Sequence, residues 1–370
     1  MKKVLFISNI PVPYRIDFYN ELGKYMDVTV VFEAKGASNQ GIRFNYNLDS
    51  IKYFKAVFLK EGDICEKKVN FKILKYLFGK YDEVVLTSYS YFTEMFYLIC
   101  MKLLKKPYYL SSDGGMIKND EKKIKYLWKK YLITGAKGYF SPSKAADEYL
   151  HYYGAEKTRI NRYPFTTYYR SEQIKRPISN EEKNSLKREL NIPYNKVVLG
   201  VGQFIYRKGW DLLLESARRL PDDVGIIIVG GVVTAEYQKL IEKYKLQNVI
   251  FLDFMDSYEL HKYYKLSDVF VLPTREDIWG LVINEAMNFA LPIITTDQCI
   301  AGIELVENGK NGYLIGNLSD SNCPDRIAEC ILNILENPMV QMNYSNESLK
   351  RIHLYSIEDM ASAYERILNK

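Results

Sequence analysis

The sequence predicts an α/β protein built from two doubly wound domains, and three observations support that fold class. The chain has 370 residues, more than one hydrophobic core usually spans. Short β-rich runs alternate with helical patterns, and repeated βα units form parallel sheets with helices on both faces. A polar segment without periodicity, at 168–183, interrupts the alternation. We therefore expect domains at 1–170 and 171–355, with a helix at 356–370 packing back on the first.

The elements follow from the spacing of apolar residues, which predicts strands where runs are short and helices where the period is longer. In the first half we expect strands at 4–8, 28–32, 84–87, 108–111 and 138–141, and helices at 14–24, 71–78, 93–104, 122–133 and 144–152. In the second half we expect strands at 197–201, 225–229, 249–252, 268–272 and 292–295, and helices at 210–219, 235–245, 256–266 and 280–289. Helices at 322–336 and 356–369 close the chain.

Composition narrows the class of protein. The net charge of +6 suits phosphorylated substrates or an anionic membrane surface. The five cysteines are scattered without a CxxC pair, which indicates a reducing compartment and neither a disulfide framework nor a zinc site. The first apolar run breaks at Asn9 and Pro11, so it predicts a strand rather than a signal peptide. The most apolar helical run, at 95–104, is too short to span a bilayer. We expect a cytoplasmic or peripheral protein.

Acidic residues surround a tryptophan and a glycine in TREDIWGLVINEAM, at 274–287, directly after a predicted strand. Ligands of doubly wound sheets bind beyond the carboxyl ends of strands. Gly280 allows close approach of the backbone, and the start of the following helix offers N–H groups to a phosphate. Glu285, Asp277 and Glu276 can accept hydrogen bonds from ligand hydroxyls. This pattern predicts a nucleotide-sugar site, and the alternative is that Asp277 caps the helix while Glu285 is solvated.

A second loop with glycines, GVGQFIYRKGW at 200–210, also follows a predicted strand. Arg207 and Lys208 stand beside Gly209, and a lysine and an arginine next to a glycine turn can hold a diphosphate. The alternative is that this basic pair is solvated. No G-x-G-x-x-G run opens a helix after the first strand, which argues against a dinucleotide cofactor.

The two loops together resemble glycosyltransferase family 4, whose members are retaining enzymes of the GT-B fold, with two Rossmann-like domains facing a central cleft. The family pattern G-R-x-x-x-x-K-G corresponds to residues 202–209, and E-x-F-G-x-x-x-x-E-A corresponds to residues 277–286. The resemblance covers most of the chain and is sharpest in the second half. It implies Lys208 on the diphosphate and Glu285 on the ribose. The donor-binding residues it implies are Gly202, Gln203, Arg207, Lys208, Glu276, Asp277, Ile278, Trp279, Gly280, Leu281, Val282 and Glu285.

Two departures from the family pattern shape the remaining assignments. The family arginine is replaced by Gln203, so we expect Arg207 to supply part of the missing charge. The first half lacks the histidine that many members place after a mid-domain strand, and Asp113 stands near that position. Asp113 can hydrogen-bond a sugar hydroxyl, or it can form an Asp-Gly turn with nothing bound. Tyr14 and Arg15, after the first strand, are assigned to the acceptor.

The resemblance implies a retaining glycosyltransferase that moves a sugar from a nucleotide diphosphate-sugar to a glycan or a lipid-linked acceptor, as in lipopolysaccharide or capsule synthesis. The assigned catalytic residues are Asp277, Glu285, Lys208 and Asp113. No D-x-D pair or cluster of carboxylates and histidines predicts a metal site, so Lys, Arg and helix N–H groups are expected to neutralise the diphosphate. We expect no cofactor and no nucleic-acid partner. Two alternatives stay open: a nucleotide-sugar 2-epimerase of the same fold, and a non-catalytic nucleotide-sugar-binding protein.

One predicted helix carries a basic face. MIKNDEKKIKYLWKKYLI, at 116–133, places lysines on one side and apolar residues on the other. A basic amphipathic helix can lie on anionic lipid at the inner face of the plasma membrane. Alternatively, Ile124, Leu127, Trp128 and Tyr131 pack this helix on its own sheet.

Overall fold

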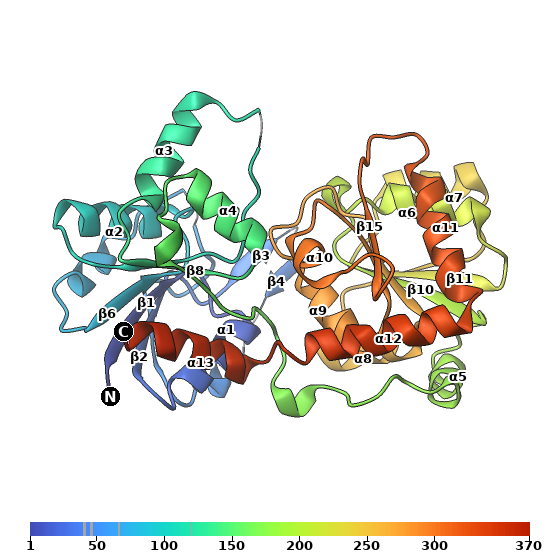
Figure 1. Ribbon diagram of the computed structural model, residues 1–370, viewed down its shortest axis with the longest axis horizontal. Coiled ribbons are helices and arrows are strands. Elements are labelled where there is room, and N and C mark those ends of the chain that lie inside the picture. Colours follow the sequence, from blue (N-terminus) through green and yellow to red (C-terminus); the bar gives the residue numbers. More distant parts are fainter. Residues whose placement is uncertain (40–41, 45–46, 66, 119) are drawn as a thin grey trace. The chain divides into compact units, whose positions relative to one another are not determined.

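Each half of the chain contains a parallel sheet with helices packed around it, as Figure 1 shows. This computed structural model describes residues 1–39, 42–44, 47–65, 67–118 and 120–370. The chain divides into two units, the first formed by Met1–Arg170 with Tyr355–Lys370 and the second by Ser171–Leu354. The predicted α/β class with two doubly wound sheets is confirmed.

The sheet of the first unit has the strand order β5-β2-β1-β6-β7-β8-β9, and every pair in it is parallel. The order reverses between β1 and β6, because β2 and β5 lie on one side of β1 and the later strands lie on the other. A separate antiparallel pair joins β3 to β4. The strands are β1 (Lys3–Ser8), β2 (Asp27–Phe32), β3 (Ala37–Asn39), β4 (Ile42–Phe44), β5 (Lys55–Phe58), β6 (Glu83–Leu86), β7 (Tyr109–Ser111), β8 (Gly138–Ser141) and β9 (Ile160–Arg162).

The C-terminal helix α13 (Ile357–Leu368) is part of the first unit and packs against α1 (Pro13–Leu22). Tyr364 anchors it: the ring stacks on Phe140 with centroids 3.9 Å apart, and its hydroxyl lies 2.7 Å from Ser111 Oγ. The other helices of this unit are α2 (Phe92–Leu103), α3 (Lys123–Ile133) and α4 (Lys144–Tyr152), with 3-10 turns at Leu48–Ser50, Phe71–Tyr76, Lys157–Arg159 and Arg170–Glu172.

The sheet of the second unit has the order β12-β11-β10-β13-β14-β15 and is parallel throughout. Its strands are almost entirely apolar because helices cover both faces. The order reverses between β10 and β13. The strands are β10 (Lys196–Val201), β11 (Val224–Val229), β12 (Val249–Leu252), β13 (Val269–Leu272), β14 (Ile293–Thr296) and β15 (Gly312–Ile315).

Eight helices are described in the second unit, and three of them were not predicted. The first, α5, lies in the expected linker and begins at Ser179 with a capping box to Glu182. The second, α10, is a short helix that follows Cys299. The third, α12, follows Asn337 and has a proline in its first turn. The helices are α5 (Asn180–Glu189), α6 (Trp210–Ser216), α7 (Ala235–Tyr244), α8 (Ser257–Leu266), α9 (Leu281–Asn288), α10 (Ile300–Leu305), α11 (Cys323–Leu335) and α12 (Pro338–Ile352), with 3-10 turns at Tyr206–Lys208 and Ala217–Arg219.

The structure corrects two predictions in the first unit. The segment 71–78, predicted as an α-helix, is the short 3-10 turn Phe71–Tyr76. The basic helix predicted at 116–133 begins only at Lys123, and position 119 of that segment lies outside the described residues.

The apolar residues of α3 do not pack this helix on its sheet. Ile124, Leu127, Trp128 and Tyr131 are 75%, 50%, 45% and 41% exposed, and α3 buries Leu132 and Ile133 instead. Within the part of the chain that the structure describes, no helix has the length and apolar composition needed to cross a bilayer.

Candidate active site

The two glycine-containing loops lie side by side at the edge of the second unit's sheet. The loop at 202–209 follows β10, and the loop at 273–280 follows β13. These two strands are neighbours, and the strand order reverses between them. In doubly wound sheets, ligands bind beyond the carboxyl ends of the strands at this reversal. The topology therefore brings the two predicted donor loops to one place.

Glycines in the first loop make room for its neighbours. Gly209 adopts φ +74°, and a Cβ there would lie 1.9 Å from the backbone oxygen of Pro273, in the second loop. Gly202 has φ +149°, and a Cβ there would press on the side chain of Lys208 at 3.1 Å. Trp210 is fully buried and donates from Nε1 to the backbone oxygen of Gln203 at 2.9 Å. The loop is thus closed tightly against the sheet edge, with Lys208 folded back over Gly202.

The cationic residues of the first loop contact the acids of the second. Lys208 Nζ donates to Asp277 Oδ2 at 2.6 Å, and the side chains are only 11% and 15% exposed. Arg207 Nη1 donates to the backbone oxygen of Glu276 at 2.6 Å and lies 3.7 Å from Asp277 Oδ2. Arg207 is 44% exposed, so its guanidinium reaches the same carboxylate from solvent. Asp277 therefore fixes two cations beside the loop where a diphosphate is expected.

Backbone contacts hold the second loop in place. The amide of Asp277 donates to Gln298 O at 2.8 Å, and its carbonyl accepts from the amide of Ile300 at 3.2 Å. Cys299 Sγ donates to Trp279 O at 3.0 Å, and burial raises the pKa of this thiol to about 12, so it stays protonated. These contacts tie the loop to the segment that begins α10.

Trp279, which was assigned to the donor, is buried in the second loop. The ring is 4% exposed and its Nε1 donates to Asn284 Oδ1 at 2.9 Å. This hydrogen bond holds the loop against the first turn of α9. Ile278, by contrast, is 55% exposed.

The helix α9 begins directly after the second loop. Gly280 is its N-terminal capping position at φ +97°, and a Cβ there would lie 2.7 Å from Cys299 Sγ. Leu281 and Val282 form the first turn, where helical N–H groups lack intrahelical partners and favour a negative charge. The first turn of α9 therefore stands where the sequence predicts an anion site.

Glu285 lies one turn further along α9 and is partly buried, so it is not the fully solvated acid of the alternative left open in the sequence analysis. Tyr264, from α8, donates its hydroxyl to Glu285 Oε2 at 2.9 Å. Burial raises the pKa of Glu285 to about 7, against a smaller lowering by the Tyr264 hydrogen bond. The carboxyl group is therefore near its titration midpoint at neutral pH, and Tyr264 fixes its orientation. Sequence reasoning missed Tyr264, because no motif connects α8 with α9.

Tyr14 and Arg15, assigned to the acceptor, meet Asp113, assigned to catalysis, in the first unit. Arg15 is 8% exposed, and its Nη2 donates to Asp113 Oδ2 at 2.6 Å, while Nη1 donates to Ser8 Oγ at 3.0 Å. Tyr14 Oη lies 3.5 Å from Asp113 Oδ2. Burial alone would lower the pKa of Arg15, but Asp113 and Tyr14 raise it well above its ordinary value. Asp113 is therefore a carboxylate paired with Arg15.

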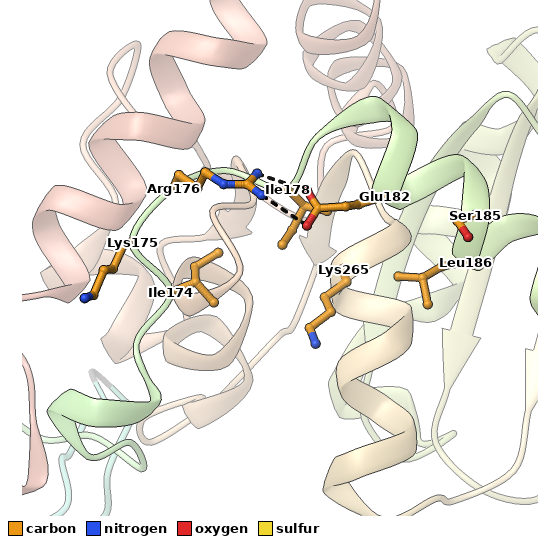
Figure 2. A pocket seen from close by; sticks show the side chains of 8 residues that line it. All are labelled: Ile174, Lys175, Arg176, Ile178, Glu182, Ser185, Leu186 and Lys265. Atoms are coloured by element: carbon orange, nitrogen blue, oxygen red, sulfur yellow. Dashed lines mark hydrogen bonds and ion pairs between the residues drawn. The ribbon is translucent and has the colours of Figure 1, made fainter.

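A further pocket of the second unit contains none of the predicted residues. It has a volume of about 480 Å³ and lies between the segment before α5, α5 itself and α8. Figure 2 shows Arg176 and Glu182 joined across it by two hydrogen bonds, of 3.0 and 3.2 Å. The pairing neutralises Arg176, and we assign this pocket no part in the chemistry. Elsewhere, in the portion of the chain that is described, no three His, Cys, Asp or Glu side chains gather in a group that could hold a metal ion.

The comparisons with known proteins agree with this geometry. Residues 182–351 match the family model of glycosyl transferases group 1. A protein of Haemophilus influenzae described as an uncharacterized glycosyltransferase is 30% identical over 186 residues, which cover 47% of this chain and 49% of that protein. The D-inositol 3-phosphate glycosyltransferase of Corynebacterium glutamicum is 21% identical, with 93% of this chain and 91% of that protein covered. The chain spans about half the length, or less, of several curated relatives that it matches.

Solved structures share the fold along the whole chain. HepE from Anabaena, solved with UDP, has a TM-score of 0.77 at 16% identity, covering 100% of both chains. Sucrose-phosphate synthase from Thermosynechococcus elongatus has a TM-score of 0.75 at 16% identity, covering 100% of this chain and 98% of that one. The resemblance inferred from the two loops therefore agrees with the match of residues 182–351, which contain both loops, to the group 1 glycosyltransferases, and the chain has the GT-B fold.

Proposed function

We propose that this chain is a retaining glycosyltransferase that takes a sugar from a nucleotide diphosphate-sugar, without a metal ion, and adds it to a glycan or lipid-linked acceptor of a surface polysaccharide. The observation that carries this proposal is the pair of loops at the strand reversal of the second unit. There, two cations lie beside the carboxylate of Asp277 in the loop that leads into α9, and Glu285 lies one turn along that helix. A diphosphate requires the cations and the helix amides, and the sugars require hydrogen-bond acceptors.

The ion pair between Lys208 and Asp277 suits a site that must receive an anion. Without donor, Asp277 balances the buried charge of Lys208 and holds the amine in position. When a diphosphate arrives, Lys208 can donate to it, and Asp277 can accept a hydrogen bond from a hydroxyl of the transferred sugar. Arg207 adds a second cation next to the diphosphate, in the place of the charge that Gln203 does not provide. Glu285, fixed by Tyr264, accepts from the ribose hydroxyls.

The transfer step follows from these charges. The bond between the anomeric carbon and the diphosphate oxygen breaks, and the bonding pair leaves with the diphosphate. The acceptor oxygen bonds to the anomeric carbon on the same face, and its proton passes to the departing diphosphate. Lys208, Arg207 and the first turn of α9 stabilise the charge on the leaving group, a contribution of about 3–4 kcal/mol for one well-placed donor. No side-chain base is needed for this step.

The acceptor class is supported by the printed roles of relatives. A glycosyltransferase of O-antigen biosynthesis from Escherichia coli, WclY, is 28% identical over 118 residues. WaaG, a glycosyltransferase involved in lipopolysaccharide biosynthesis, has a TM-score of 0.69 at 15% identity. A donor with a UDP moiety is supported by HepE, which was solved with UDP and glucose. A role in surface polysaccharide synthesis places the enzyme in the cytoplasm, where nucleotide-sugars are available.

The exposed face of α3 supports contact with an anionic membrane. Four apolar side chains of α3 are at least 41% exposed, and Leu103 at the end of the contacting helix α2 is 73% exposed. Aromatic and aliphatic side chains flanked by lysines insert at the headgroup level of a bilayer. The exposed lysines are Lys122, Lys123, Lys125 and Lys130. Lys129 does not belong to this face, because it pairs with Glu121 at 2.6 Å and is 18% exposed.

A panel of nucleotide-sugars in a thermal-shift assay tests the donor site. A ligand at 100 times its Kd adds about 2.7 kcal/mol of stability, enough to raise the melting temperature by several degrees. We expect one nucleotide-sugar to do so equally well with and without EDTA, and more strongly than its sugar alone. Failure of every member of the panel would refute the donor site. Binding followed by conversion of the donor without any acceptor would favour the epimerase, and binding without turnover would favour a sensor.

A further inference from the structure

Two buried glutamates lie at the strand reversal of the first unit, and the proposed chemistry does not use them. The strand order reverses between β1 and β6, which is where ligands of doubly wound sheets bind. The loop after β1 leads to Arg15, and the loop after β6 leads to Glu94 in the first turn of α2. Glu33 directly follows β2, the neighbour of β1 on its other side. Glu33 and Glu94 thus flank the end of β1.

Both carboxylates are buried and incompletely satisfied. Glu33 is 5% exposed and Glu94 is fully buried. Among the described residues, Oε1 of Glu33 and both carboxylate oxygens of Glu94 lack a hydrogen-bond partner of normal geometry. A buried ionised group without partners is costly, so such groups are usually paired or bound to a ligand. Neither glutamate forms an ion pair within the described chain that would explain its burial.

The pKa values of both glutamates are raised, because each carboxyl group is buried without enough partners for its charge. Burial raises the pKa of Glu33 to about 7, against weaker lowering by Thr93 and by the backbone amide of Glu94. Burial also raises the pKa of Glu94 to about 8, and repulsion by Glu33 adds to this. At neutral pH the two groups therefore include both a hydrogen-bond donor and a hydrogen-bond acceptor, which is what adjacent sugar hydroxyls can satisfy.

Glu33 is also part of the wall of a pocket of about 500 Å³, and most of the remaining lining residues are cationic, polar or aromatic, with Val69 and Cys65 beside them. Phe71 in this lining is 65% exposed, which leaves its ring available to the apolar face of a sugar. Thr93, at the start of α2, holds the segment 68–70 of this lining in place: its Oγ1 donates to Lys68 O at 3.3 Å and accepts from the amide of Asn70 at 3.1 Å. Besides Glu33, Thr93 and Phe71, the lining includes Lys60, Lys68 and Lys72.

We propose that this pocket binds a saccharide bearing a phosphate or carboxylate group, with its hydroxyls on Glu33 and its anionic group among Lys60, Lys68 and Lys72. Lysines around the opening favour an anion, whereas the buried carboxylates repel one, so only a ligand with an anionic end and a hydroxyl end fits both. In calling this saccharide the acceptor of the transfer, we rely on the proposed function. The anionic saccharide can be a free sugar phosphate or the sugar of a lipid-linked diphosphate.

Calorimetric titration of the full chain tests this site with defined probes. The probes are the 6-phosphates of glucose, galactose and mannose, glucuronic acid, the three neutral hexoses and inorganic phosphate. We expect at least one anionic sugar to bind about ten-fold tighter than both its neutral sugar and phosphate alone, because both ends of the ligand contribute. Farnesyl diphospho-N-acetylglucosamine in detergent forms a second arm. Binding of this probe alone would identify the lipid-linked source.

The variants are chosen so that loss of binding cannot be mistaken for unfolding. Glu33→Gln removes an unsatisfied charge while keeping the shape of the side chain, so the melting temperature should not fall. It should weaken binding about ten-fold, as should the double variant Lys68→Gln with Lys72→Gln. The matched controls are Lys67→Gln, an exposed lysine in the same segment, and Glu61→Gln, an 84% exposed glutamate, and neither should change binding.

Two outcomes would overturn the proposal: neither an anionic sugar nor the lipid-linked probe binds more tightly than inorganic phosphate, or binding survives Glu33→Gln unchanged. The thermal shift caused by a nucleotide-sugar, measured on the same samples, separates this failure from failure of the proposed function. The donor residues lie in the second unit, so the pocket variants should keep the full donor shift.

Discussion

Replacing Glu285 by Gln should weaken the binding of the donor without unfolding the protein. The carboxylate is held by the Tyr264 hydroxyl at 2.9 Å through Oε2, so we assign Oε1 to the ribose. A hydrogen bond to a charged group contributes about 1.5–3 kcal/mol, which corresponds to a drop of roughly 10- to 150-fold in kcat/KM. Tyr264→Phe should have a smaller effect of the same kind, since it removes only the contact that orients the carboxylate.

The raised pKa of Glu285 makes a sharper form of this prediction. With a pKa of about 7 in the free protein, a donor that binds only the ionised form should bind about ten-fold tighter at pH 8 than at pH 6. Glu285→Gln should remove this pH dependence. Calorimetric titration of the best nucleotide-sugar at pH 6, 7 and 8 measures it for both proteins.

Stability provides the control for this variant. Because the folded state raises the pKa of Glu285 from 4.5 to about 7, its contribution to stability is fully present below pH 4.5 and is lost as the pH rises through 7. The Gln variant should therefore melt at the same or a higher temperature than the wild type at pH 8. An unchanged kcat/KM together with an unchanged pH profile would remove Glu285 from the donor site.

Three further predictions concern charge and exposure. Lys208→Ala should lower kcat/KM most, by roughly the 2.7–4 kcal/mol of a transition-state charge contact. Arg207→Ala should lower kcat/KM measurably less, and Gln203→Arg should be tolerated. Wild-type kinetics for Arg207→Ala would show that Arg207 takes no part in the reaction. Trp128→Ser should reduce sedimentation with anionic liposomes at low salt, and equal sedimentation of variant and wild type would leave α3 without a membrane role. Glu94→Gln should raise the melting temperature at pH 9 but not at pH 4. The pKa of Glu94 is raised to about 8, so ionising this buried carboxyl group destabilises the folded state only as the pH rises from 4.5 through 8. A lower melting temperature of the variant at pH 9 would contradict the burial of an unsatisfied charge.

The fold and the donor loops were largely predictable because their signals are local. Alternating β-branched runs and helical periods specify parallel sheets, and Gly209 and Gly280 adopt φ values of +74° and +97° that favour glycine. The polar helices α5 and α12 were missed because neither has a clear apolar stripe. Their caps, Ser179 with Glu182 and Asn337 with Pro338, were the signals that could have revealed them.

Other parts of the site could not be predicted, because they depend on which strands become neighbours. Tyr264 reaches Glu285 from another helix, and Glu33 approaches Glu94 only because β2 and β6 both lie next to β1. The amphipathic pattern of α3 gives an apolar face but does not say whether anything covers it. The structure leaves Trp128 45% exposed and draws Lys129 into a pair with Glu121 instead.

The most direct test of the central claim is transfer of a labelled sugar. The protein is incubated with the nucleotide-sugar that gives the largest thermal shift, labelled in its sugar, together with lipid-linked glycans extracted from membranes. We predict that label enters the glycan in the presence of EDTA, with the anomeric configuration of the donor, and that Lys208→Ala abolishes most of this transfer. Label that stays in the nucleotide-sugar or its epimer, or that enters the glycan equally well with Lys208→Ala, would contradict the account.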